Sequence, residues 1–96
     1  MLPYSSGTTG LPKGVMLSHR NLVVNVDQFL GVVGISAGEV TPAFLPFFHI
    51  YGLQVMVNVY LSAGAAIATL PRFDLELFLR LTQDHRAERL WIVPPV

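Results

Sequence analysis

The chain has 96 residues, of which 52% are hydrophobic and only 12% are charged, and its formal net charge is zero. A neutral chain lacks the basic surface of a nucleic-acid-binding protein, and a chain without cysteine has neither disulfides nor cysteine metal sites. Three histidines, at His19, His49 and His85, are too scattered to predict a zinc site. The charged fraction is about half of the usual value, which is typical of a segment that packs inside something larger.

The first residues are expected to form two short strands around a surface loop. Leu2–Tyr4 is the predicted end of one strand and Val15–Leu17 the start of the next. The glycine-rich segment between them, Ser5–Gly14, has few apolar anchors and is predicted to lie on the surface. No basic region followed by an apolar core is present, so we expect no signal peptide and a cytoplasmic location.

A helix is predicted over residues 19–33. Ser18 is placed to cap its N-terminus and Gly34 to end it. Apolar positions recur every three to four residues, which is the period of an amphipathic helix. We therefore expect Val23, Val26 and Leu30 to be buried and Arg20 and Asp27 to be exposed.

Between Val40 and Pro71 the chain carries no Asp, Glu, Lys or Arg. Ile50–Leu70 is long enough to span a bilayer, which leaves a small membrane-associated protein as one alternative. Polar and small residues interrupt the segment, however, and no basic cluster flanks it. We favour a strand at Ala43–Leu45, a buried helix at Leu53–Leu61 with Gly64 near its end, and a buried strand at Ala65–Leu70.

The last part of the chain predicts one more helix and one more strand. Asp74 is placed to cap a helix that turns Leu75, Phe78, Leu79 and Leu81 inward. Leu90–Val93 is predicted to be a strand that Pro94 ends. Alternating strands and helices indicate an α/β fold, a piece of a layered, largely parallel sheet with crossover helices. No linker divides residues 1–96 into separate domains.

The loop chemistry predicts a polyphosphate site. Tyr4-Ser-Ser-Gly-Thr-Thr-Gly-Leu-Pro-Lys-Gly-Val15 combines hydroxyls, three glycines and one lysine. Glycines let backbone N–H groups form a concave nest for anions, and Lys13 adds a positive charge. The loop is not a Walker A motif, because Pro12 stands where the second glycine should be and Gly14 follows the lysine. A flexible Ser/Gly linker is the alternative, which the Pro-Lys-Gly ending disfavours.

This loop resembles the phosphate-binding signature of the adenylate-forming enzymes, which include acyl-CoA synthetases and 4-coumarate–CoA ligases. Pro46-Phe-Phe-His-Ile-Tyr-Gly52 is similar to the P-x-F-H-x-x-G segment of that family. Pro71–Asp74 and Val93–Val96 give weaker matches, so the resemblance covers the whole chain. It implies an ATP-dependent ligase that forms an acyl-adenylate from a carboxylic acid and then a thioester with coenzyme A.

The resemblance also implies roles for single residues. The ATP phosphates would be bound by Ser5, Ser6, Gly7, Thr8, Thr9, Gly10 and Lys13. His49 and Tyr51 would line the acyl pocket, and Lys13 and His49 would be catalytic. Arg72 would lie near coenzyme A, although by residue type a solvated charge is the better interpretation. Taken without the resemblance, His49 is more often a hydrogen-bonded core residue. For Lys13 a solvated loop cation is the less favoured alternative.

Several parts of the family pattern find no match in these residues. They include the adenine-binding aromatic residue, the glutamate linked to Mg²⁺ and the C-terminal lysine that drives adenylation. We therefore expect residues 1–96 to be a partial AMP-dependent synthetase domain, with ATP, coenzyme A and Mg²⁺ as cofactors and the rest of its domain as a partner. An inactive truncated remnant is the alternative. Glu88-Arg89 departs from the family pattern at the start of the last predicted strand.

Overall fold

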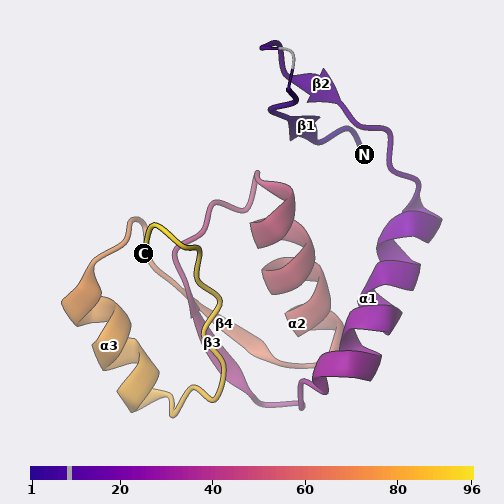
Figure 1. Ribbon diagram of the computed structural model, residues 1–96. Helices are drawn as coiled ribbons and strands as arrows, with labels where there is room; N and C mark the ends of the chain where they lie inside the picture. Colours follow the sequence, from indigo (N-terminus) through magenta and orange to yellow (C-terminus); the bar gives the residue numbers. More distant parts are fainter. Residues whose placement is uncertain (9) are drawn as a thin grey trace.

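A computed structural model describes residues 1–8 and 10–96 (Figure 1). Its N-terminal hairpin pairs β1 (Tyr4–Ser5) with β2 (Lys13–Gly14) in antiparallel register. Two further hydrogen bonds extend the pairing, from the Val15 N–H to the Pro3 oxygen at 2.8 Å and from the Leu17 N–H to the Met1 oxygen at 3.0 Å. Strands on both sides of the loop are therefore confirmed, but the second is Lys13–Gly14 and not the predicted Val15–Leu17.

Helix α1 (His19–Val33) begins and ends where the sequence predicts. The Ser18 hydroxyl accepts from the Asn21 N–H at 3.1 Å, and the Asn21 side-chain oxygen accepts from the Ser18 N–H at 3.0 Å. This reciprocal pair is a capping box, with asparagine in the place of the usual glutamate. Gly34 adopts φ 65°, a left-handed conformation that glycine tolerates, and its N–H donates to the Leu30 oxygen.

The buried face of α1 differs from the prediction at one position. Val26 is buried, Leu30 is half-buried, and Arg20 and Asp27 are exposed, as expected. Val23 is 59% exposed, so its predicted burial is wrong. The side of α1 packed against the core cluster carries Val26, Phe29, Leu30 and Val33, which leaves Val23 at the edge of the contact.

A β–helix–β unit forms the middle of the fold (Figure 1). Strand β3 (Val40–Ala43) leads into a helix that is wound as a π-helix over η1 (Gly52–Val59) and as an α-helix over α2 (Tyr60–Ser62). Strand β4 (Ala66–Thr69) returns parallel to β3. The parallel pair with a crossover helix is confirmed, although β3 ends at Ala43, where the predicted strand begins. Among the described residues, no helix is long and apolar enough to cross a membrane.

Helix α3 (Leu75–Asp84) lies on the other side of the sheet region from α1 in Figure 1. The Asp74 carboxylate caps it by accepting from the Leu77 N–H at 2.9 Å, as predicted. Phe78 is buried against Phe44, but Leu75 is 60% exposed and Leu79 is 54% exposed, so their predicted burial is wrong. The helix turns Phe78 toward β3, and Leu75 and Leu79 lie on a neighbouring face.

The predicted strand at Leu90–Val93 is not formed, and this segment has no regular secondary structure. Ala66 and Leu70 donate their N–H groups to the backbone oxygens of Glu39 and Ala43. Along β3, residues whose backbone N–H and C=O face β4 therefore alternate with residues whose backbone groups face the opposite edge. By this alternation Pro42 faces away from β4. A strand on that edge would meet a proline, which has no N–H to donate.

Side chains hold the C-terminal segment in place instead. The Thr41 hydroxyl donates to the Arg89 backbone oxygen at 3.0 Å. The Arg89 guanidinium pairs with Glu39 and donates to the Val33 oxygen at 3.2 Å. Trp91 donates from Nε1 to the Tyr60 hydroxyl at 2.7 Å. These contacts join the end of α1, the start of β3, α2 and the C-terminal segment around one buried polar cluster.

Glu39 is charged in this cluster. Its side chain is only 5% exposed, and burial by itself raises the pKa of the Glu39 carboxyl. Hydrogen bonds from Arg89 and the Ser36 N–H, the Arg89 charge and the Tyr60 hydroxyl outweigh burial, so that pKa lies below its ordinary value of 4.5. Burial raises the pKa of the Tyr60 hydroxyl above 10.0, which keeps this group protonated as a donor to Glu39.

We predict that Glu39 makes the free energy of unfolding depend on pH in the acid range. A carboxyl whose pKa is lowered by folding stabilises the protein above its unfolded pKa, and this stabilisation is lost as the pH falls through the lower folded value. The free energy of unfolding of the wild type, measured with urea, should therefore decrease as the pH falls below about 4.5. Glu39→Gln should be less stable at pH 7 and should show a smaller acid slope.

The matched control is Glu76→Gln, which changes an exposed carboxyl in the first turn of α3. Equal acid slopes for the wild type and Glu39→Gln would contradict the prediction.

Candidate functional site

The hairpin holds the phosphate-loop residues on one exposed edge of the molecule. Ser5 lies directly opposite Lys13, and opposite residues of antiparallel strands project from the same face. Gly7 and Gly10 have φ values of 49° and 86°, in the left-handed region that favours glycine. A Cβ placed on Gly7 would lie 4.0 Å from Cδ and Cε of Lys13. The lysine stem therefore runs along the loop.

All the described members of the predicted phosphate site are exposed, which confirms the predicted surface position of this loop. They are Ser5, Ser6, Gly7, Thr8, Gly10 and Lys13. Thr9 lies outside the described residues.

A tight turn orients the His49 imidazole. The His49 N–H donates to the Pro46 oxygen at 3.1 Å, and the Tyr51 N–H donates to His49 Nδ1 at 3.2 Å. Because Nδ1 accepts a hydrogen bond, the neutral ring carries its proton on Nε2. The histidine is exposed, and it can offer this Nε2–H to a ligand oxygen.

Gly52 allows this turn to pack closely against the start of η1. A Cβ at this position would lie 2.4 Å from the Pro46 oxygen and 2.9 Å from the Pro46 carbonyl carbon. Such distances to backbone atoms leave no room for a side chain. The glycine that ends the P-x-F-H-x-x-G segment is therefore a steric requirement of the turn that carries His49.

His49 lies between two cavities. One of about 250 Å³ faces the hairpin and is lined by Pro3, Tyr4, Ser5, Ser6, Val15, Leu17, His49 and Ile50. The other, of about 340 Å³, is lined by Leu45, Pro46, His49, Tyr51 and Val93. The structure thus brings Ser5, Ser6 and His49 around one space, and places Tyr51 with His49 around a neighbouring apolar one.

Two predicted site residues stand apart from these cavities. Lys13 faces Ser5 across the hairpin but lines neither space. Arg72 is exposed in the bend between β4 and α3, also outside both linings.

In the described ranges, no group of three His, Asp or Glu side chains is placed to hold a metal ion. We assign none of the described residues to a Mg²⁺ ion.

Sequence reasoning missed Leu45 and Val93 as lining residues. Their apolar character predicted strands, and their only other signal is their position beside Pro46 and Pro94. Val93 reaches the cavity from the opposite end of the chain. A single sequence gives no indication of that pairing.

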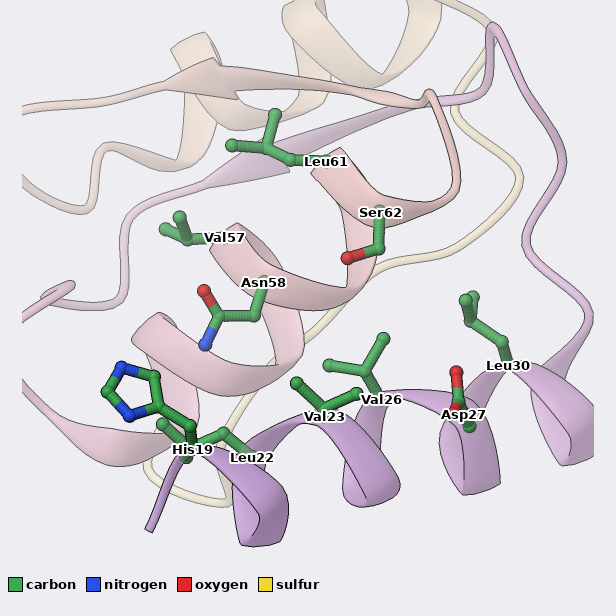
Figure 2. Close-up of a pocket in the computed structure, with 10 residues that line it drawn as sticks. All are labelled: His19, Leu22, Val23, Val26, Asp27, Leu30, Val57, Asn58, Leu61 and Ser62. Atoms are coloured by element: carbon green, nitrogen blue, oxygen red, sulfur yellow. The ribbon is translucent and has the colours of Figure 1, made fainter. Parts of the chain in front are cut away.

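A larger groove of about 630 Å³ separates α1 from the helix formed by η1 and α2 (Figure 2). Val23, Val26 and Leu30 line it from α1, and Val57 and Leu61 line it from the facing helix. None of the motif residues lies in it. The groove is therefore separate from the candidate site.

Comparison with known proteins agrees with this geometry. The family model described as AMP-binding enzyme matches residues 1–96. The 4-coumarate–CoA ligase 1 of Oryza sativa subsp. japonica is 48% identical over 99 residues, which cover 99% of this chain and 18% of the ligase.

Two solved structures have closely similar folds. ATP-bound MatB from Rhodopseudomonas palustris is 39% identical with a TM-score of 0.84, over 93% of this chain and 17% of MatB. The o-succinylbenzoate coenzyme A synthetase MenE from Bacillus subtilis, in complex with ATP and magnesium ion, is 29% identical with a TM-score of 0.86, over 98% of this chain and 20% of MenE.

The fold and the two motifs thus define a segment of an adenylate-forming enzyme. The chain belongs to the AMP-binding enzyme family. It spans about 18% of the length of the curated relatives that it matches.

We predict that Gly52→Ala disrupts the His49 turn. The new Cβ has to push the Pro46 carbonyl away, and overpacking of this kind costs about 1–3 kcal/mol. Urea unfolding should show this loss. The nitrogen NMR spectrum of the His49 ring should also lose the preference for the Nε2–H tautomer.

Gly31→Ala is the matched control, because Gly31 lies in α1 and a Cβ added there would meet no other atom within 4 Å. Alanine in a helix interior should stabilise the chain by up to about 1 kcal/mol. An unchanged His49 spectrum in Gly52→Ala would show that the close approach does not orient the ring.

Proposed function

We propose that this chain supplies the phosphate-binding and carboxylate-binding part of an ATP-dependent acid–CoA ligase. The observation that carries the proposal is the position of His49. It shares one cavity with Ser5 and Ser6 of the phosphate loop and a second, apolar cavity with Tyr51. A carboxylate near His49 would therefore lie between a triphosphate on the loop and its own hydrocarbon tail.

The first half-reaction would use both cavities that His49 lines. The acid's carboxylate oxygen attacks the α-phosphorus of ATP, the bond to the β-phosphate oxygen breaks, and pyrophosphate leaves. Hydroxyls and N–H groups of Ser5, Ser6, Gly7, Thr8, Thr9 and Gly10 would bind the phosphates, and Lys13 would offset the charge on the leaving pyrophosphate. His49 would hold the carboxylate through Nε2–H.

The second half-reaction exchanges AMP for a thiol. The thiol sulfur of coenzyme A attacks the acyl carbonyl carbon and its proton passes to solvent. The bond between the acyl carbon and the phosphate oxygen breaks, and AMP leaves with its electron pair. Arg72 is exposed and positively charged, and we propose it only as an outer contact for coenzyme A phosphates.

The apolar cavity supports an acid with a hydrocarbon or aromatic tail. Leu45, Pro46, Tyr51 and Val93 line it, and none of these side chains carries a charge that would pair with a second carboxylate. His49, at the same cavity, is left for the reacting carboxylate. The relatives named as 4-coumarate–CoA ligases support the same class of acid.

The test of Lys13 uses a chimera in which this chain replaces the matching segment of the rice 4-coumarate–CoA ligase 1. Lys13→Ala should slow adenylate formation roughly 10²–10³-fold, which is typical for loss of one preorganised donor. Thioester formation from supplied acyl-adenylate should change much less, because no pyrophosphate is present in that step. Both half-reactions are measured separately.

Arg20→Ala is the matched control, since Arg20 is an exposed cation on α1 that lines neither cavity. Equal losses in the two half-reactions would reject a phosphate role for Lys13.

The 96 residues alone are predicted to catalyse no ATP–pyrophosphate exchange with any acid. Among the described residues no group of three His, Asp or Glu side chains is placed to hold a metal ion, and Ser5, Ser6 and His49 line their shared cavity from exposed positions. Holding both reactants in a fixed geometry is worth roughly 7–11 kcal/mol in such reactions, and exposed side chains alone cannot supply it. Exchange above background by purified chain, measured against a Lys13→Ala blank, would overturn this prediction.

A further inference from the structure

A buried glutamine joins the two helices that carry the candidate site. Gln54 lies in the first turn of η1 and is only 6% exposed. Its Nε2 donates to the Leu22 backbone oxygen at 2.8 Å and to the Asn25 side-chain oxygen at 3.1 Å, both on α1. Its Oε1 accepts from Asn58 Nδ2 at 2.7 Å, one turn along its own helix.

This polar contact joins the helices that follow the hairpin and the His49 turn in the chain. Both helices begin at the end of the molecule that carries the hairpin and run in the same general direction (Figure 1). Gln54 follows His49 closely in the chain, and only a short connection separates Gly14, the last residue of β2, from the start of α1. The position of η1 on α1 therefore sets the position of His49 relative to Ser5 and Ser6.

Apolar packing alone does not fix this position. Val26 of α1 shares the core cluster with Val59 and Tyr60, but the rest of the facing helix surfaces line an open groove of about 630 Å³, with Asn58 among its lining residues (Figure 2). Apolar contacts are non-directional, whereas a hydrogen bond weakens steeply when its geometry changes. A buried amide that lost these partners would also be left unsatisfied, which resists sliding or rotation of η1.

We propose that Gln54 is a positioning residue, which fixes the distance between the phosphate loop and His49 through its bonds to α1. The catalytic part of this inference rests on the proposed function; the positional part does not. Misplacement of a reacting group by about 1 Å can cost about 10²-fold in rate. Loss of the Gln54 contact should therefore act on adenylate formation, where acid and phosphates must meet.

The substitution that tests this is Gln54→Leu, which replaces the amide by an apolar side chain of similar size and removes all three hydrogen bonds. The control is Gln28→Leu, at an exposed glutamine on α1. In the rice ligase chimera we expect Gln54→Leu to slow adenylate formation about 10–100-fold. Thioester formation from supplied acyl-adenylate and the rates of Gln28→Leu should stay close to those of the unsubstituted chimera.

A second measurement reports position without catalysis. The chain has no cysteine, so Phe48→Cys, at an 89% exposed side chain beside His49, accepts a single nitroxide label. Its relaxation effect on the amide protons of Ser5 and Ser6 reports their distance from the turn. We expect the effect to change in Gln54→Leu and to stay constant in Gln28→Leu.

The outcomes separate the two proposals. Unchanged relaxation in Gln54→Leu, with or without a lower melting temperature, overturns the positioning role. Changed relaxation with equal loss in both half-reactions retains the positional part and overturns its catalytic consequence. Changed relaxation in the 96-residue chain, together with a folded chimera that makes no adenylate even without substitution, supports the positioning role and rejects the proposed function.

Discussion

The fold depends on one part-buried ion pair, the buried Glu39 carboxylate with the partly exposed Arg89 guanidinium. The partners lie 50 positions apart in the chain, and their hydrogen bonds reach the Val33 oxygen and the Tyr60 hydroxyl as well. Four segments therefore meet at a single charged cluster. Burying the Glu39 carboxylate costs desolvation free energy, and removal of Arg89 would leave that buried charge uncompensated. The pair thus stabilises this arrangement chiefly by penalising every arrangement that separates the segments.

The candidate site lies at the other end of the helix formed by η1 and α2 from this ion pair. The sheet and the C-terminal segment hold α2, so η1 is anchored at its far end, and Gln54 anchors it again near its start. Gly52 then lets the His49 turn lie against the helix without an intervening side chain. The α2 contacts, Gln54 and Gly52 all help to fix the position of the His49 ring relative to the exposed hairpin. A histidine on a surface turn acquires a defined orientation only through such support.

Local signals in the sequence predicted local structure well. Ser18, Gly34 and Asp74 cap helices as expected, because capping depends on residues only a few positions away. Burial was less predictable: Val23 and Leu79 have the right spacing, but the packing partner decides which face is covered. The strand expected at Leu90–Val93 failed because Pro42, far earlier in the chain, blocks the edge of β3. Ser5, Ser6 and His49 were placed together by resemblance to a family, whereas Gln54 and Val93 act through contacts with distant residues that no single sequence reveals.

The single tryptophan has a consequence for any study of this chain in solution. Trp91 is half-buried, its ring centroid lies 5.4 Å from that of Phe29, and its N–H is bound to Tyr60. Indole emission depends on the polarity around the ring, so intrinsic fluorescence reports whether the C-terminal segment is seated on the frame. Trp91 lines neither cavity at His49. The molecule therefore carries a built-in optical probe of how the C-terminal segment, which also supplies the cavity-lining Val93, is seated.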